Sequence, residues 1–311
     1  MRRWVFGLIG LLGFIAAVLP PANAADKLTL GIYSGDDYLL AFIAKDEGYF
    51  EKHGLDVTFQ FMTANMSLVT GALVGDSLQI GATTIPVVLQ ADDNGLDIKI
   101  VAGATATQPG FQLAAILVRP DLEVKTAKDL EGKTVSVSSL NSFSHILVRE
   151  WLRVRGADPS KVHFVETPMG QFGDGLTAKK LDAVIPVEPW LSRIQSTGQG
   201  KLFDNFVDEL PAGIRPIIWA ANGDYVRAHP ATIAAFRAGL ADALALYKAN
   251  PEKSEAALAH YIKLPPDVLK AMPKPPMVDD VKPEHVKFWV DMMMQQKLLS
   301  HPIDPATVLA P

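Results

Sequence analysis

Short apolar runs alternate with amphipathic helical stretches along most of this chain, and this order constrains its fold more than any other feature. The alternation runs from Lys27 to about Gln199 and restarts once, after Arg119-Pro120. A strand, a helix and a second strand at this spacing form a crossover unit, in which successive strands lie parallel. The sequence therefore predicts an α/β protein in which each sheet is mostly parallel and flanked by helices.

The expected strands and helices can be placed by their periodicity. Strands are expected at residues 27–33, 55–61, 78–82, 98–104, 113–118, 134–137, 162–166, 182–186 and 217–221. Helices are expected at residues 38–53, 66–74, 85–91, 144–155, 170–180, 189–199, 230–249, 251–262, 266–271 and 283–299. From Asp224 onward the pattern is helical throughout, with prolines at several helix starts, where a missing N–H is tolerated.

The restart of the pattern predicts two lobes. We expect the chain to cross between them near Arg119-Pro120 and to return near residues 213–216, so that residues 25–118 and 216–311 form lobe 1 and residues 119–215 form lobe 2. The C-terminal helices should then cover the first lobe. Ligand sites in open parallel sheets lie outside the carboxyl ends of the strands, so two such lobes facing each other predict a binding cleft.

The first 24 residues have the features of a secretory leader. Arg2 and Arg3 precede an apolar stretch at residues 4–19, and two prolines separate that stretch from Ala22-Asn23-Ala24. The apolar stretch is short for a membrane-spanning helix of about 20 residues, and the small residues suit a signal peptidase. We expect a signal peptide over residues 1–24, cleaved after Ala24, and no stable membrane insertion afterwards.

Composition narrows the cellular setting and the partners. The chain has no cysteine, so an exported form folds without disulfides and has no lipobox cysteine for a lipid anchor. Its formal net charge of −5 argues against nucleic acid or an anionic membrane as a partner. We expect a freely diffusing periplasmic monomer that is not a lipoprotein.

Four segments resemble one family of binding proteins. They are residues 48–57 (GYFEKHGLDV), 72–81 (ALVGDSLQIG), 182–190 (DAVIPVEPW) and 247–252 (YKANPE), and they occur in the family's order. Together they resemble the periplasmic solute-binding proteins of the nitrate, sulfonate and taurine ABC importers, a group that also includes binders of thiamine-pyrimidine precursors. The resemblance implies a type II periplasmic-binding fold, hinged closure on a ligand, and delivery to an ABC permease with its ATPase.

A serine-rich segment in the second lobe is the first candidate for ligand contact. It joins a strand to a helix and offers Ser138, Asn141, Ser142, Phe143 and Ser144. Backbone N–H groups at a helix start form a favourable site for an anion. The alternative is ordinary helix capping by Asn141 or Ser142, which needs only one such side chain.

The ends of three expected strands form the matching rim of the first lobe. After the first strand come Ser34, Asp36, Asp37 and Tyr38; the next two strands are followed by Asn65, Ser67, Thr83 and Thr84. An acid in this position repels an anion and favours an amine or an aminopyrimidine. Asp37 could instead cap the following helix, and Tyr38 could lie over the cleft or pack down into the core.

Four larger side chains complete the expected site. Glu188 and Trp190 follow a second-lobe strand, and Arg215 and Trp219 lie near the return crossover. A tryptophan can stack on a flat ligand or belong to the core. Arg215 can clamp a carboxylate, sulfonate or nitrate through two hydrogen bonds, or serve as a hinge residue paired with an acid. With His145, it is the only cation that can be placed near the cleft from the sequence.

These features favour a small organic anion, sulfonate- or carboxylate-like, with a flat, apolar or amine-bearing body. Binding of a pyrimidine-type or other nitrogen heterocycle remains an alternative, as does a ligand sensor that signals to a receptor. Enzymes are disfavoured, because the seven histidines form no HExxH pair and neither a GxxxxGK[ST] nor a GxSxG motif occurs. We therefore expect no catalysis, cofactor or metal.

Overall fold

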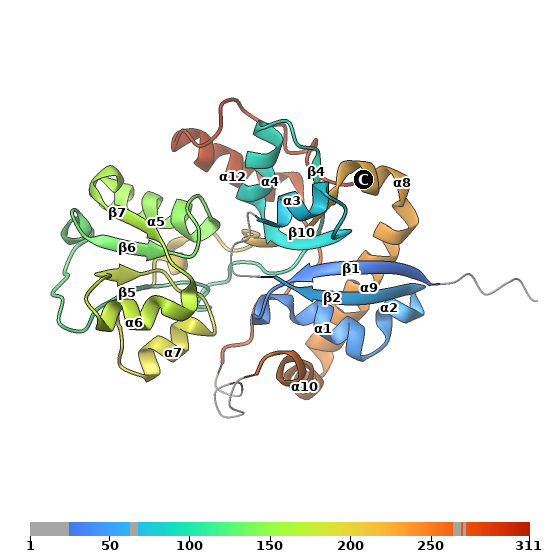
Figure 1. Cartoon of the computed structure of the whole chain (residues 1–311), viewed down its shortest axis with the longest axis horizontal. Coiled ribbons are helices and arrows are strands. Elements are labelled where there is room, and N and C mark those ends of the chain that lie inside the picture. The colour runs from blue at the N-terminus through green and yellow to red at the C-terminus, as the bar shows by residue number, and fades with distance from the viewer. Residues whose placement is uncertain (1–24, 63–67, 264–268, 270–271) are drawn as a thin grey trace, which may run out of the picture.

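The computed structural model describes residues 25–311 except 63–67, 264–268 and 270–271. Two bodies lie side by side, each built around one sheet, and extended segments of the chain run between them (Figure 1). We call the body that contains the N-terminal strand the first lobe and the other the second lobe. Among the described residues, no helix has the length and apolar character needed to cross a membrane.

The first lobe is built on a five-stranded sheet. Its strands follow the order β2-β1-β3-β10-β4. Their bounds are β1 Asp26–Ile32, β2 Leu55–Phe61, β3 Ile80–Thr84, β4 Ile98–Gly103 and β10 Ile217–Asn222. β1 pairs parallel with β2 and β3, whereas β10 pairs antiparallel with both β3 and β4. All strands but β10 therefore point the same way, and β10 is the strand that the chain forms on its return from the second lobe.

The second lobe repeats this topology. Its five-stranded sheet has the order β7-β6-β8-β5-β9, with β5 Ile116–Val118, β6 Thr134–Val137, β7 His163–Glu166, β8 Ala183–Val184 and β9 Lys201–Asp204. Only β5, the strand that follows the crossing from the first lobe, runs against its neighbours. The predicted α/β fold with mostly parallel sheets is confirmed. The edge strand β9 was not expected, because it is short and partly exposed and so has little apolar signal.

Most expected helices are present, with some changes at their ends. The first lobe contains α1 Leu39–Asp46, α2 Tyr49–Lys52, α3 Leu68–Val74, α4 Ile85–Asp93, α8 Gly223–Ala228, α9 Pro230–Ala249, α10 Pro251–Tyr261 and α12 Pro283–Gln295; the second contains α5 Phe143–Val154, α6 Phe172–Thr177 and α7 Trp190–Ser196. The single helix expected at residues 38–53 is divided at Gly48, whose φ of 69° does not continue a right-handed helix. The helix expected at residues 266–271 lies largely outside the described residues.

The C-terminal helices pack on the first lobe, as predicted. α9 contacts α1 and α2, α10 contacts α1, and α12 contacts α4. The rings of Phe50 in α2 and Phe236 in α9 stack with centroids 5.7 Å apart. A Cβ atom on Gly239 would lie only 2.6 Å from the Phe50 ring, so this close approach of α9 requires glycine.

The segments that join the lobes are hydrogen-bonded to one another. Thr107 on the outgoing segment donates its N–H to the Ile214 carbonyl at 2.8 Å, and Gly213 on the returning segment donates to the Thr107 carbonyl at 2.8 Å. The stretch around Val278 adds a third segment, because its N–H bonds to the Ala104 carbonyl at 3.0 Å. These hydrogen bonds link the two joining segments to each other and to the stretch around Val278.

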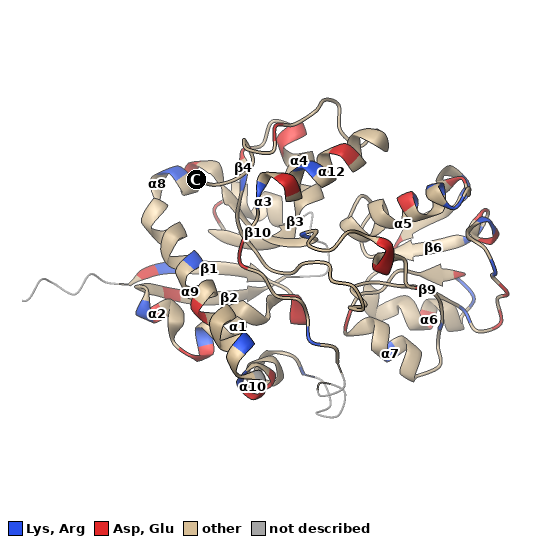
Figure 2. Ribbon diagram, turned by 180° about the vertical axis from the view of Figure 1, so that it is seen from behind, with Lys and Arg blue, Asp and Glu red and all other residues tan. Residues whose placement is uncertain are grey.

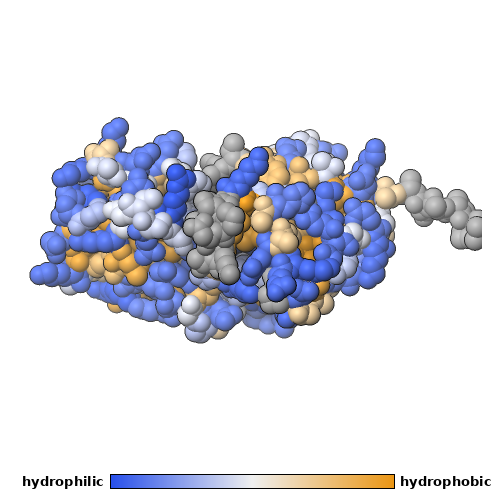
Figure 3. Space-filling view, turned by 90° about the horizontal axis from the view of Figure 1, so that it is seen from below, coloured by the Kyte–Doolittle hydropathy of each residue, from blue (hydrophilic) through white to orange (hydrophobic). Residues whose placement is uncertain are grey.

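Charge and apolar surface are spread over both lobes. Acidic and basic residues lie on helices of each lobe, without a face of one sign in the view of Figure 2. Seen from below, polar residues cover most of the surface and smaller apolar areas appear on each lobe (Figure 3).

Candidate functional site

A pocket of about 480 Å³ lies between the two lobes. It is lined by Ser34, Phe61, Tyr261, Ile262 and Lys263 from the first lobe and by Pro189, Trp190 and Arg193 from the second. This volume suits a small organic molecule. Because residues from both lobes line it, a molecule bound here would touch both lobes at once.

Aromatic side chains form two walls of this pocket. Trp190 begins α7 and is half-buried, with the Arg193 guanidinium 5.4 Å from the centroid of its ring. Phe61 ends β2 and is 49% exposed, which is unusual for a side chain of this size. Tyr261 is held in place by stacking on Phe42, with centroids 4.5 Å apart. These rings offer flat apolar surfaces against which a planar ligand can stack.

The buried acids of the first lobe face an acid of the second. Asp36 and Asp37 lie in a short 3₁₀ turn, η1 (Asp36–Tyr38), and are 3% and 9% exposed. Glu188 of the second lobe is 7% exposed and is close enough to contribute to the raised pKa of Asp36. The structure thus brings together three acidic residues that the sequence placed on opposite rims.

Burial raises the pKa of all three carboxyl groups. The pKa of Asp36 lies well above its usual range because of burial and then because of the neighbouring charges of Asp37 and Glu188. Burial raises the pKa of Asp37 to about 7, against a smaller opposing effect of the Thr105 side chain. Burial also raises the pKa of Glu188, although Ser192 donates its N–H at 3.1 Å and its hydroxyl at 2.7 Å to that carboxylate. The structure shows no side-chain cap on η1 or α1, so the capping alternative for Asp37 is not supported.

Two aromatic candidates belong to the core. Trp219 is 1% exposed and packs edge-on against Tyr38 and Phe236, with centroids 5.9 and 5.7 Å away. Tyr38 is itself 2% exposed. Burial thus supports the core alternative for both residues over contact with the ligand, since β10 lies between β3 and β4 inside its sheet and Trp219 packs into the core.

Arg215 is not an anion clamp. Its Nη2 pairs with Asp280 Oδ1 at 2.7 Å, its Nε donates to the Asp280 carbonyl at 3.0 Å, and its Nη1 donates to the Gly213 carbonyl at 2.5 Å. These bonds engage all three nitrogens of the guanidinium. The pairing with an acid that the alternative expected is present: Arg215 joins the returning segment to the stretch that contains Asp280.

Several polar groups of the serine-rich loop already have partners within the protein. Leu140 N–H donates to Glu166 Oε1 at 2.6 Å, and the Ser139 hydroxyl donates to the same atom at 3.2 Å. The hydroxyls of Ser142 and Ser144 lie 3.2 Å apart, and neither Asn141 nor Ser142 caps α5 through its side chain. The first-turn N–H groups of α5, beginning at Phe143, therefore remain the contact that this loop offers a ligand.

His145 cannot supply a positive charge to this loop. Burial lowers its pKa to about 3, so the ring is neutral at physiological pH. Its Nδ1 accepts the Asn141 N–H at 2.8 Å, which places the ring proton on Nε2. The ring also packs edge-on against Phe164, with centroids 4.5 Å apart.

The remaining candidates differ in their positions. Thr84 is fully buried and caps α4 by accepting the Val87 N–H at 3.4 Å, so it is a structural residue. Thr83 is likewise buried, at 1% exposed. Ser138 is half-buried at the end of β6. Asn65 and Ser67 lie outside the described residues.

Sequence reasoning missed several pocket residues. Phe61 stands at the carboxyl end of a predicted strand, where the general rule for ligand sites could have identified it. Arg193 lies one helical turn after Trp190 and could have been found by that spacing. Tyr261 and Lys263 carry no such signal, because only the packing of α10 brings them to the cleft.

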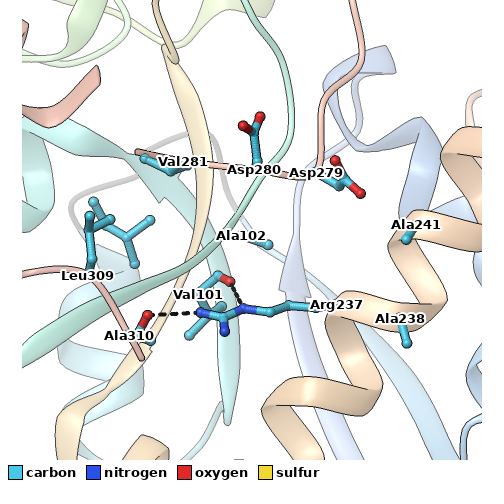
Figure 4. A pocket seen from close by; sticks show the side chains of 11 residues that line it. Val101, Ala102, Arg237, Ala238, Ala241, Asp279, Asp280, Val281, Leu309 and Ala310 are labelled. Carbon is cyan, nitrogen blue, oxygen red and sulfur yellow. Dashed lines mark hydrogen bonds between the residues drawn. The ribbon is translucent and has the colours of Figure 1, made fainter. Parts of the chain in front are cut away.

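A second cavity, of about 510 Å³, lies within the first lobe and away from the cleft (Figure 4). Arg237 is the cationic side chain in its lining. The Arg237 guanidinium donates to the Val101 carbonyl at 2.6 Å and to the Ala310 carbonyl at 3.1 Å. These bonds tie α9 to β4 and to the C-terminal segment. Arg237 therefore has a structural role, and the cavity does not span the lobes.

Known proteins share this architecture. The crystal structure of the periplasmic aliphatic sulphonate binding protein of Escherichia coli superimposes with a TM-score of 0.75 at 22% identity, covering 92% of this chain and 97% of that one. Two curated relatives are a bicarbonate transport ATP-binding protein of Synechocystis, 27% identical over 67% of this chain, and a putative ABC transporter periplasmic binding protein of Brachyspira hyodysenteriae, 26% identical over 43% of it. The chain spans only 33% and 43% of the lengths of these two relatives.

The structural likeness shows that this chain has the periplasmic-binding-protein fold. The sequence pattern of the NMT1/THI5-like family matches residues 37–254, which is more than half of the chain. That span includes Asp37 of the acidic turn, the strand β2, and the helix α7 with Trp190. The resemblance inferred from the four sequence segments is confirmed, and the chain belongs to the NMT1/THI5-like family.

Proposed function

We propose that this protein is the solute-binding component of an ABC importer. It captures a small organic molecule between its lobes, closes over it and delivers it to a permease that works with a cytoplasmic ATPase. The observation that carries the proposal is the pocket of about 480 Å³ lined by both lobes, with the aromatic side chains of Phe61 and Trp190 among its lining. The fold of the sulphonate binding protein and the name of the Brachyspira relative support the same role, which is binding rather than catalysis.

The proposal includes a location and a division of the chain. A leader over residues 1–24 directs the protein to the periplasm, where it acts as a monomer. Residues 25–118 and 216–311 form one lobe and residues 119–215 the other, and the hydrogen-bonded crossing segments at Thr107 and Gly213 act as the hinge. Closure takes place through φ/ψ changes at a few residues of these segments, as in other hinged binding proteins.

The organic anion expected from the sequence must be bound by residues other than Arg215 and His145. Arg215 is engaged with Asp280, and His145 is neutral, so neither can bind it. Arg193 and Lys263 line the pocket, are exposed, and form no ion pair within the described parts of the chain. We propose that a carboxylate or sulfonate group of the ligand lies toward these two cations at the mouth of the pocket.

A thermal-shift screen followed by small-angle scattering tests this function. Sulfonates, nitrate, small carboxylates and aminopyrimidines are screened, and a ligand at a hundredfold excess over its Kd should stabilise the protein by about 2.7 kcal/mol. The same ligand should reduce the radius of gyration as the lobes close. Trp190→Ala should weaken binding at least tenfold, whereas Val154→Ala, an exposed change on the outer end of α5, should not.

The outcomes separate binding from other roles. A hit that is consumed during the assay would replace the binding function with catalysis. A hit whose affinity is unchanged in Trp190→Ala would place the ligand outside this pocket. Failure of every compound to stabilise the protein would contradict the proposal as a whole.

A further inference from the structure

Three buried carboxyl groups gather beside the interlobe pocket. Asp36 and Asp37 belong to the first lobe and follow the pocket residue Ser34 by two and three positions. Glu188 belongs to the second lobe and directly precedes the pocket residue Pro189. None of these three carboxyl groups forms an ion pair with any cationic side chain that the structure describes. Burial favours the neutral form of such unpaired carboxyl groups, in agreement with the raised pKa of each, and a cation placed among them would stabilise their charged form.

One buried polar atom of the cluster lacks a partner among the described residues. Asp36 Oδ2 belongs to a side chain that is 3% exposed, and it has no hydrogen-bond partner among the described residues. This oxygen is therefore a free acceptor, and a missing donor is the simplest account of it, because a buried polar group without a partner is unfavourable.

The neighbours of the cluster supply no positive charge. Tyr38 and Tyr247 lie close enough to interact electrostatically with the acids, and both are neutral phenols at physiological pH, since burial raises the pKa of each further above its ordinary value. Within the described residues, no three acidic or histidine side chains are placed so that they could share one metal ion. A bound metal is therefore a poor match, whereas a larger cation with several N–H donors can reach acids on both lobes.

We propose that Asp36, Asp37 and Glu188 bind a protonated nitrogen group of the ligand, a primary ammonium or an amidinium, beside the interlobe pocket. This inference rests on the proposed solute-binding function and adds the chemical class of one end of the solute. The nitrogen group donates to Asp36 Oδ2 and to Asp37 from the first lobe and lies against Glu188 from the second. An acidic group at the other end of the same molecule would face Arg193 and Lys263. The acids thus select against ligands that are only anionic.

Matched pairs of small aromatic compounds test the inference by titration calorimetry at pH 7.5. One pair is 4-(aminomethyl)benzoate and 4-(hydroxymethyl)benzoate, and the other is benzylamine and benzyl alcohol. In each pair only the nitrogen group differs. We expect the amine to bind at least tenfold more tightly than the alcohol in both pairs. Benzoate, which offers only an anion, should bind more weakly than 4-(aminomethyl)benzoate by a similar factor.

Conservative substitutions of the acids test whether these side chains cause the preference for the amine. Asp36→Asn and Glu188→Gln should each reduce the preference for the amine at least fivefold while leaving the alcohols unaffected. Asp129→Asn, a change in a 3₁₀ turn of the second lobe away from the cleft, is the control and should leave all affinities unchanged. Circular dichroism spectra show whether each variant folds, and Asp37→Asn replaces any variant that does not.

Equal affinity for both members of each pair, or no detectable binding of either amine, would overturn the inference. Tighter binding of benzoate than of the amines would overturn it too, and would leave the solute-binding function standing. Binding of an amine without any decrease in the radius of gyration would support the nitrogen site and count against lobe closure. The two proposals can thus fail separately.

Discussion

Replacement of Arg215 by alanine should destabilise the fold without a direct effect on ligand affinity. The Arg215 side chain is 9% exposed, and its guanidinium makes three hydrogen bonds, two of them to the backbone carbonyls of Gly213 and Asp280. Each carbonyl loses a charged donor in the variant, at about 1 kcal/mol apiece. The Asp280 carboxylate is 46% exposed and can be rehydrated, so the ion pair itself adds less than about 1 kcal/mol. With the lost packing of the aliphatic stem, the free energy of unfolding should fall by about 3 kcal/mol.

Urea unfolding followed by far-UV circular dichroism measures this loss. Arg153→Ala is the matched control, because Arg153 pairs with Glu150 on the surface and its side chain is 52% exposed. That variant should lose less than about 1 kcal/mol. If Arg215→Ala were as stable as the control and bound its ligand more than tenfold more weakly, Arg215 would act on the ligand and its assignment as a structural partner of Asp280 would be wrong.

Two further predictions follow from the buried residues around the site. Trp219→Ala should lower the free energy of unfolding by about 3–5 kcal/mol, because it removes a fully buried ring between Tyr38 and Phe236; a loss below 1 kcal/mol in urea unfolding would contradict the core assignment. The pKa of Asp37 is about 7 in the folded protein and 3.8 in the unfolded chain, so its favourable contribution is complete below about pH 4 and is lost as the pH rises to about 7. Asp37→Asn should therefore become more stable relative to the unsubstituted protein between pH 4.5 and 7.5, as measured by urea unfolding in the absence of ligand; a constant difference across this range would mean that Asp37 titrates normally.

Local patterns were sufficient to predict much of the fold. Periodicity and helix-end signals depend on neighbouring residues, so the alternation before Gln199 and the helical region after Asp224 could be recognised without tertiary information. The failures occurred where local signals are weak. β9 is a short edge strand with little apolar pattern, and the helix expected at residues 38–53 is divided by the backbone conformation of Gly48.

The candidate site was predicted less completely, because direction and pairing are properties of the packed structure. The strand-end rule correctly indicated the turn at Asp36 and Asp37 and the segment at Glu188 and Trp190 as rims that face each other. It could not indicate which side chains turn inward. Trp190 and Trp219 looked alike in the sequence, yet one lines the pocket and the other fills the core.

The sequence by itself determined that this chain is a two-part α/β protein of a solute-binding family, since hydrophobic periodicity and four ordered segments are written in the order of the residues. Only the tertiary structure decided the chemistry of the cleft. Arg215 meets Asp280, which lies 65 residues away along the chain, and so is unavailable to a ligand. Asp36 and Glu188 come from different lobes, and their shared burial without a counter-ion exists only because the two lobes meet.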